Sequence, residues 1–118
     1  MELNDYQRAA LRTAAARTKP NELFHLVLGL NAEAGEVAEL FQKLVRDAGS
    51  DLESLDRRQL ALELGDVLWH LAVLADYFDI PLEAVGEAHI GKVTDRARRG
   101  MLGGRSEEHT SELQSLAY

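Results

Sequence analysis

Two pairs of acidic residues occupy positions where an amphipathic helix should carry leucine. Glu33 and Glu36 lie within LNAEAGEVAEL, and Glu63 and Asp66 lie within LALELGDVLWHLAVL. The apolar residues around each pair recur at steps of three and four, which places Glu33 and Glu63 on the core-facing side. A buried carboxylate without a partner is costly, and several close together repel one another. We therefore expect a cation among them, and a divalent metal ion is the simplest choice.

Residues three apart lie on nearly the same face of a helix, so each acidic pair offers two oxygens from one turn. If the two helices pack antiparallel, as the short stretch between them predicts, all four carboxylates converge. The chain has no cysteine, which leaves hard oxygen ligands, and these suit Mg²⁺, with Mn²⁺ as a substitute. The alternative is a set of solvated or salt-bridged glutamates, but two acidic pairs on apolar stripes argue against it.

The elements that must position these residues are helices. Long stretches rich in alanine, leucine and glutamate, with only two prolines, predict an all-α, four-helix fold. The expected helices cover about 3–17, 21–47, 56–78 and 82–99. Asn21 and Asp56 are suited to cap the second and third helices, and Gly49 follows the second. Gly29 and Gly35 lie inside the second helix at a cost of roughly 1 kcal/mol each, which predicts a kink or the close approach of another backbone.

Composition narrows the class of protein. A chain of 118 residues is the size of one domain, and its net charge of −7 argues against a nucleic-acid-binding surface. The N-terminus lacks the apolar core of a signal peptide, and no apolar run reaches the length of a membrane span, so we expect a cytoplasmic protein without membrane contact. Residues 105–118, RSEEHTSELQSLAY, resemble a translated sequencing-library adapter. We therefore expect a domain over 1–104 and a non-native or disordered tail.

The two acidic segments resemble the metal signature of the MazG-like, all-α nucleoside triphosphate pyrophosphohydrolases. GLNAEAGEVAEL is similar to that superfamily's GLxGExGEvael segment, with Ala32 as a departure, and ELGDVLWHLAVLAD is similar to ELGDvLWYlaxla, with His70 as a departure. DYQRAALRT and IPLEAVGEA are also similar, so the resemblance spans about residues 4–100.

This resemblance implies Mg²⁺-dependent hydrolysis of a nucleoside triphosphate, NTP or dNTP, between its α and β phosphates. The products would be a monophosphate and pyrophosphate, and the role would be removal of unwanted nucleotides. The resemblance also implies that Glu33 or Glu36 orients or deprotonates the attacking water. The metal ligands that it implies are Glu33, Glu36, Glu63 and Asp66.

Basic side chains are candidates for the phosphates. Lys92, Arg96 and Arg99 share one face of the fourth helix and could simply complement its dipole, at about 0.3–1 kcal/mol per charge. The resemblance implies that a lysine and an arginine at this place bind the triphosphate, although His89 stands where the family has asparagine. Lys43, beyond the acidic pair of the second helix, is a further phosphate candidate.

Three side chains are candidates for contacts with the base: Trp69, His70 and His25. The single tryptophan could pack in the core, or it could stack on a base, worth roughly 1–3 kcal/mol. His70 could ligate a metal, form hydrogen bonds or fill space, and His25 could reach a base or a sugar. The sequence does not identify which base the substrate carries.

Two other functions are compatible with a helical protein of this kind. A di-iron carboxylate bundle would need two ExxH pairs and two further glutamates, whereas this chain has one such pair, Glu22 and His25. A non-catalytic helical interaction module is the other alternative. Long helices in a lone chain leave apolar surface uncovered, so we also expect a homodimer or a dimer of dimers.

Overall fold

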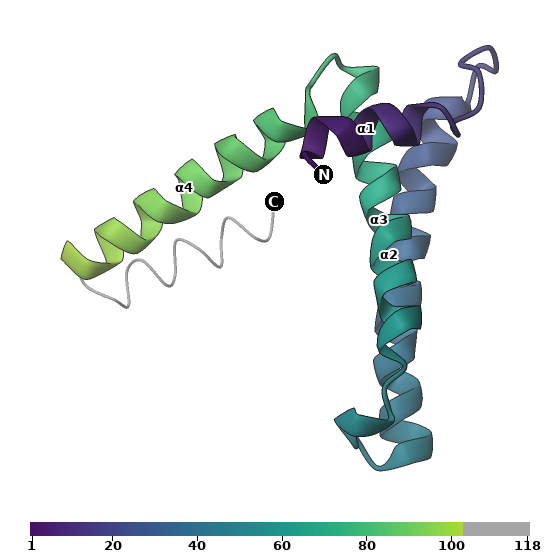
Figure 1. Ribbon diagram of the computed structural model, residues 1–118, viewed down its shortest axis with the longest axis vertical. Helices are drawn as coiled ribbons and strands as arrows, with labels where there is room; N and C mark the ends of the chain where they lie inside the picture. Colours follow the sequence, from purple (N-terminus) through teal and green to yellow (C-terminus); the bar gives the residue numbers. More distant parts are fainter. Residues whose placement is uncertain (103–118) are drawn as a thin grey trace. The chain divides into compact units, whose positions relative to one another are not determined.

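The computed structural model describes residues 1–102, and these are helical throughout apart from short connections (Figure 1). The elements are α1 (Leu3–Leu11), α2 (Glu22–Ala48), the one-turn 3₁₀ helix η1 (Leu52–Ser54), α3 (Arg57–Tyr77) and α4 (Leu82–Leu102). No strand occurs among these residues, which confirms the all-α, four-helix prediction. The predicted tail, residues 105–118, lies outside the described part of the chain.

The chain divides into two compact units, Met1–Leu82 and a second unit that begins at Glu83. In the first unit α2 and α3 lie side by side along their length as a helical hairpin, with η1 in the connection between them (Figure 1). The helix α1 lies across the end of this hairpin where α3 finishes, and packs against α3. The described part of the second unit consists of α4 alone.

The ends of α2 and α3 follow from local chemistry. Gly49 ends α2 in the left-handed conformation, with φ 58°, which a residue without a β-carbon adopts at little cost. Asp56 caps α3 as predicted, because its carboxylate accepts a hydrogen bond from the backbone N–H of Gln59 at 3.1 Å. Asn21 precedes α2, but its side chain makes no capping hydrogen bond.

The first helix is shorter than predicted, because it ends at Leu11 rather than near residue 17. Thr13 explains the difference. Its backbone N–H bonds to the carbonyl of Ala10 at 3.0 Å, and its hydroxyl donates to the same carbonyl at 2.7 Å. A threonine side chain that bonds the backbone in this way competes with helical hydrogen bonding. The hydroxyl oxygen also accepts a hydrogen bond from the indole N–H of Trp69 at 2.8 Å, which ties the end of α1 to α3.

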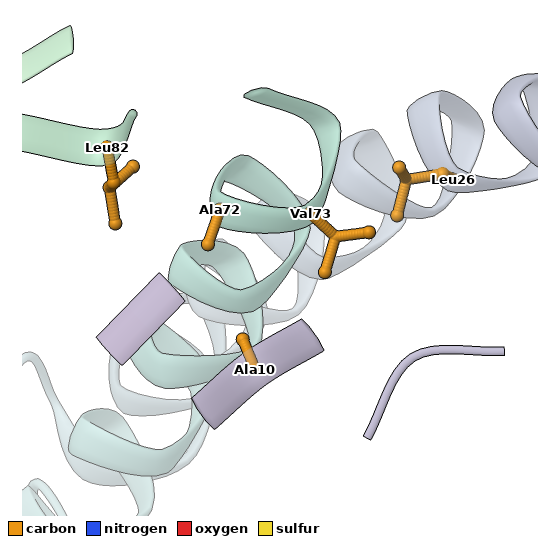
Figure 2. Close-up of a cluster of buried hydrophobic side chains, with 5 residues drawn as sticks. All are labelled: Ala10, Leu26, Ala72, Val73 and Leu82. Carbon is orange, nitrogen blue, oxygen red and sulfur yellow. The ribbon is translucent and has the colours of Figure 1, made fainter. Parts of the chain in front are cut away.

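The core of the first unit is small and lies where three helices and the start of α4 meet. Its buried apolar side chains are Ala10, Leu26, Ala72, Val73 and Leu82 (Figure 2). Tyr6, Leu11, Leu68, Trp69, Leu74 and Tyr77 pack around it half-buried. No helix within residues 1–102 is both long and apolar enough to cross a bilayer.

A buried amide links α1 to the connection between α3 and α4. The Nε2 of Gln7 donates hydrogen bonds to the carbonyls of Ala72 at 3.0 Å and Ile80 at 3.1 Å, and its Oε1 accepts one from the backbone N–H of Leu82 at 2.9 Å. The Gln7 side chain therefore satisfies the first backbone donor of α4, which no intrahelical bond can reach. This one side chain therefore ties α1 to α3 and to the first residue of α4.

Candidate metal centre

Four carboxylates converge on the facing sides of α2 and α3. Glu33 and Glu36 come from α2, and Glu63 and Asp66 come from α3. One carboxylate oxygen from each lies within 4.8 Å of the others. The spacing of three within each pair puts two side chains on one turn, and the hairpin brings the two turns opposite each other. The arrangement is the one expected from the sequence.

Two of these carboxylates are only partly accessible to water. Glu33 and Glu63 are half-buried, whereas Glu36 and Asp66 are exposed. The Oε2 atoms of Glu33 and Glu63 are completely buried and have no hydrogen-bond partner within the described residues. A buried carboxylate oxygen normally accepts at least one hydrogen bond, since leaving it unpaired costs free energy. These two atoms therefore require a partner that side chains and backbone do not supply.

Burial and the crowding of like charges raise the proton affinity of two members of the cluster. Burial raises the pKa of Glu33, and the neighbouring carboxyl groups of Glu36 and Asp66 act in the same direction, while His70 acts against them. Burial also raises the pKa of Glu63, with the neighbouring carboxyl group of Glu36 as the next cause. Both carboxyl groups thus hold a proton more tightly than an isolated glutamate does.

The residues present fit a hard divalent cation. Within residues 1–82 none of the four carboxylates forms an ion pair with lysine or arginine. The donor set is all oxygen, and none of its members is a histidine. Carboxylate oxygens on a short spacing are what Mg²⁺ and Mn²⁺ prefer. A cation between the helices would pair both orphaned oxygens and offset the repulsion that adds to burial in raising the two pKa values.

His70 lies beside the cluster, one turn after Asp66 on α3. Its Nδ1 is 2.8 Å from the backbone carbonyl of Asp66. Because a carbonyl oxygen can only accept, Nδ1 carries the proton, and Nε2 points away from this bond. The ring does not belong to the group of four carboxylates, but its effect on the pKa of Glu33 places it close to them.

Trp69 and His25, the other two candidates for base contacts, are separate from the carboxylates. Trp69 is half-buried against the apolar core, and its indole N–H is used by the hydroxyl of Thr13. This contact anchors the end of α1 to α3, so the indole has a structural role. His25 is exposed on α2, two turns before Glu33, and takes no part in the carboxylate group. Their role toward a base stays a prediction.

Lys43 occupies a different site from the carboxylates. It lies two turns beyond Glu36 on α2 and lines a hollow of about 240 Å³ at the closed end of the hairpin, together with Asp47, Asp56 and Gln59. The pKa of Asp47 is lowered mainly by its hydrogen bond to Arg46, with Lys43 as a smaller cause. Lys43 thus has Asp47 as an anionic neighbour.

Lys92 and Arg96 lie on α4, which belongs to the second unit. They are four positions apart, so they share one face of this helix. Lys92 is exposed and Arg96 is half-buried. Arg99, one turn further on, forms an ion pair with Asp95 at 3.2 Å. The expected contact of Lys92 and Arg96 with phosphates stays a prediction.

Sequence reasoning missed two neighbours of the site. The hydroxyl of Tyr6 on α1 donates to the carbonyl of Gly65 at 3.4 Å, and burial followed by the charge of Asp66 raises the pKa of this phenol. No sequence pattern connects residues so far apart. The second neighbour is Gly29, whose missing side chain leaves room for the ring of His70. The sequence predicted a close approach at this glycine, although of a backbone and not of a side chain.

The fold and the site together define an all-α protein with a carboxylate cluster held by a helical hairpin. Comparison with known proteins identifies the family to which it belongs. The MazG nucleotide pyrophosphohydrolase domain family matches residues 22–101, and the chain therefore belongs to this family. The matched region contains all four carboxylates as well as α2, α3 and nearly all of α4.

Two relatives share this region. The Gene 37 protein of Mycobacterium phage L5 is 35% identical over 85 residues, which cover 72% of this chain and 75% of the phage protein. Uncharacterized protein YvdC of Bacillus subtilis strain 168 is 38% identical over 72 residues, which cover 57% of this chain and 68% of YvdC. No solved structure gives a significant match.

Proposed function

We propose that this protein hydrolyses nucleoside triphosphates, NTP or dNTP, to the monophosphate and pyrophosphate, with Mg²⁺ held by the four carboxylates. The observation that carries this proposal is the pair of buried, unpartnered oxygens on Glu33 and Glu63 within the converging cluster. Membership of the MazG family supports the reaction, because the matched domain is described as a nucleotide pyrophosphohydrolase. The physiological task would be removal of unwanted nucleotides.

The ligands of the metal would be Glu33, Glu36, Glu63 and Asp66. When bound, Mg²⁺ would neutralise charge on the phosphate oxygens and lower the pKa of a water molecule. Glu36 and Asp66 are exposed and so border the side from which a substrate arrives, while Glu33 and Glu63 anchor the inner side. The cluster alone carries like charge to a triphosphate, so we expect no binding of the nucleotide without the metal.

The water molecule would be activated by Glu33 or Glu36. Both carboxylates belong to the group that would hold the metal and its bound water, which is the reach that a general base needs. The water oxygen would add to one of the two phosphorus atoms that flank the α–β bridge, and the bond from this phosphorus to the bridging oxygen would break. The bridging oxygen would leave with the other phosphate, and the glutamate would take a proton from the water. Lys43, Lys92 and Arg96 are the proposed cations for the phosphates, and Trp69, His70 and His25 are proposed to contact the base.

A nucleotide panel tests this function. The purified protein is incubated with each common NTP and dNTP in Mg²⁺, Mn²⁺ or excess chelator, and pyrophosphate and orthophosphate are measured separately. The proposal expects pyrophosphate and monophosphate in equal amounts, and neither with chelator. Orthophosphate as the first product would contradict the assigned bond. Bound iron with a visible absorption band would support the di-iron alternative instead.

We also propose that the protein forms a homodimer through an interface between two copies of α2. A dimer of dimers would contain this interface twice. Positions along one side of α2 recur at alternating steps of three and four, are exposed, and are apolar apart from one asparagine. They are Phe24, Val27, Asn31, Ala34, Ala38, Phe41 and Val45. We call this surface the α2 seam. Such spacing is typical of helices that pack against another helix.

The order of sizes along the α2 seam suits a second copy of the same chain. Large side chains stand at both ends, with Phe24 and Val45 each 66% exposed, and small alanines stand in the middle. Under a two-fold axis, an antiparallel copy of α2 would place the large residues of one end against those of the other. Its alanines would meet alanines at the point of closest approach. The seam is thus self-complementary.

A further inference from the structure

Gly29 on α2 and His70 on α3 face each other one helical turn beyond Glu33 and Asp66. A β-carbon added at Gly29 would lie 2.7 Å from Nε2 of His70 and 3.1 Å from its Cδ2. Atoms in folded proteins do not pack so closely, because repulsion rises steeply below van der Waals contact. The imidazole therefore occupies the space that any side chain at position 29 would need.

The imidazole is held in this place from two other sides. Its Nδ1 donates to the carbonyl of Asp66 at 2.8 Å, which fixes the ring to the turn that carries this carboxylate. Its edge contacts the ring of Trp69, with centroids 5.0 Å apart and planes at 72°. Trp69 is itself tied to Thr13. The ring could swing away from Gly29 only by giving up these contacts.

The glycine–histidine contact lies between the apolar core and the carboxylates. Steps of three and four lead from Leu26 through Gly29 to Glu33 on α2, and from Val73 through His70 to Asp66 on α3. Leu26 and Val73 belong to the buried core. Gly29 and His70 lie one helical turn, about 5.4 Å, from Glu33 and Asp66. A change in the separation of α2 and α3 at Gly29 would therefore also move these two carboxylates.

We propose that His70, seated on Gly29, is a positioning residue that sets the approach of Glu33 and Asp66 and so tunes the affinity of the metal site. The inference rests on the proposed metal-dependent function. A bare glycine lets the ring lie against α2, and the ring in turn prevents the helices from closing further at this level. A β-carbon at position 29 would force the ring or the helix to move, and a carboxylate would move with it.

Two glycines on the same helix provide a matched test. Gly29→Ala and Gly35→Ala make the same chemical change in the interior of α2, but a β-carbon at Gly35 meets nothing within 4 Å. The readouts are the Kd for Mn²⁺ by titration calorimetry at fixed pH, and the urea unfolding midpoint in chelator. We expect Gly29→Ala to raise the Kd about ten-fold, the scale seen when support around a metal ligand is disturbed. Gly35→Ala should leave the Kd within two-fold.

The second part of the test uses a variant of His70. His70→Ala removes the obstacle, so Gly29→Ala made in that background should change the Kd less than two-fold, which shows that the two positions act through one contact. This double variant also keeps the test decisive if Gly29→Ala alone does not fold. Equal Kd values for Gly29→Ala and the unmodified chain, or full additivity with His70→Ala, would overturn the inference while leaving the proposed function intact. No Mn²⁺ binding by the unmodified chain would overturn the proposed function itself, and the inference with it.

Discussion

Glu36 of α2 and Glu63 of α3 stand on opposite helices of the hairpin, yet an oxygen of each belongs to the group of four that lie within 4.8 Å of one another. Ionised carboxylates this close repel, and the charge of Glu36 adds to burial in raising the pKa of Glu63. In the proposed function a divalent cation bound between the helices removes this repulsion. The proposal makes several measurable predictions.

Replacing Glu63 by glutamine should separate stability from activity. The amide keeps the shape of the side chain and can donate a hydrogen bond to Glu36, so the repulsion disappears together with one metal ligand. We expect Glu63→Gln to unfold at the same or a higher urea concentration than the unmodified chain in chelator. We also expect it to lose roughly 100-fold or more in Mg²⁺-dependent pyrophosphate release.

Glu39 is the control for this change. It is an exposed glutamate on α2 outside the cluster, so Glu39→Gln removes the same charge without touching the site. Its activity should stay within two-fold of the unmodified chain. Unchanged activity in Glu63→Gln would show that the cluster does not carry the reaction.

The stability of the metal-free protein should fall as the pH rises from the ordinary pKa of a glutamate through the raised pKa values of the folded state. The pKa values of Glu33 and Glu63 are raised in the folded state, by burial and then by their acidic neighbours. Between the unfolded and the folded pKa the native state binds more protons than the unfolded state, so deprotonation favours unfolding. Urea midpoints measured in chelator across this range test the slope.

Saturating Mg²⁺ should abolish this dependence, because the metal binds only the deprotonated carboxylates and so removes the bound protons from the native state. Stability in Mg²⁺ should therefore be higher than in chelator and nearly independent of pH over the same range. Parallel slopes with and without Mg²⁺ would mean that the metal does not bind through these carboxylates.

The carboxylate cluster could be predicted from sequence because it depends on two local regularities. Helical spacing puts Glu33 beside Glu36 and Glu63 beside Asp66, and a short connection makes the hairpin antiparallel. Both regularities are properties of neighbouring residues. The end of α3 was predictable for the same reason, since the Ile80–Pro81 step follows it closely.

Contacts between distant residues could not be predicted in this way. The end of α1 depends on Thr13 meeting Trp69, and the room at Gly29 depends on which side chain α3 presents there. The sequence indicated that this glycine was costly in a helix, but only packing decides what lies against it. The sequence did not predict the buried hydrogen bonds of Gln7, because a single glutamine on a helix is normally exposed.

Gln7 should be among the most sensitive polar positions of the first unit. Gln7→Leu keeps most of the volume but leaves the carbonyl of Ile80 and the N–H of Leu82 without their partner. Buried backbone groups that lose a partner cost about 1–3 kcal/mol, so we expect a loss of about 2–3 kcal/mol in the free energy of unfolding. Chemical denaturation measures it, and Gln59→Leu, at an exposed position of α3, is the control. Equal stability of the two variants would contradict the structural role of this amide.

The α2 seam predicts how the oligomer can be broken. Ala38 lies near its middle and is exposed in the single chain, so Ala38→Arg would place a long charged side chain where two copies of α2 approach most closely. We expect light scattering to report a dimer for the unmodified chain and a monomer for this variant at the same concentration. Glu39→Arg introduces the same side chain next to the seam but off it, and should stay dimeric. A monomeric unmodified chain would rule out the proposed interface, and a dimeric Ala38→Arg variant would show that the copies associate through another surface.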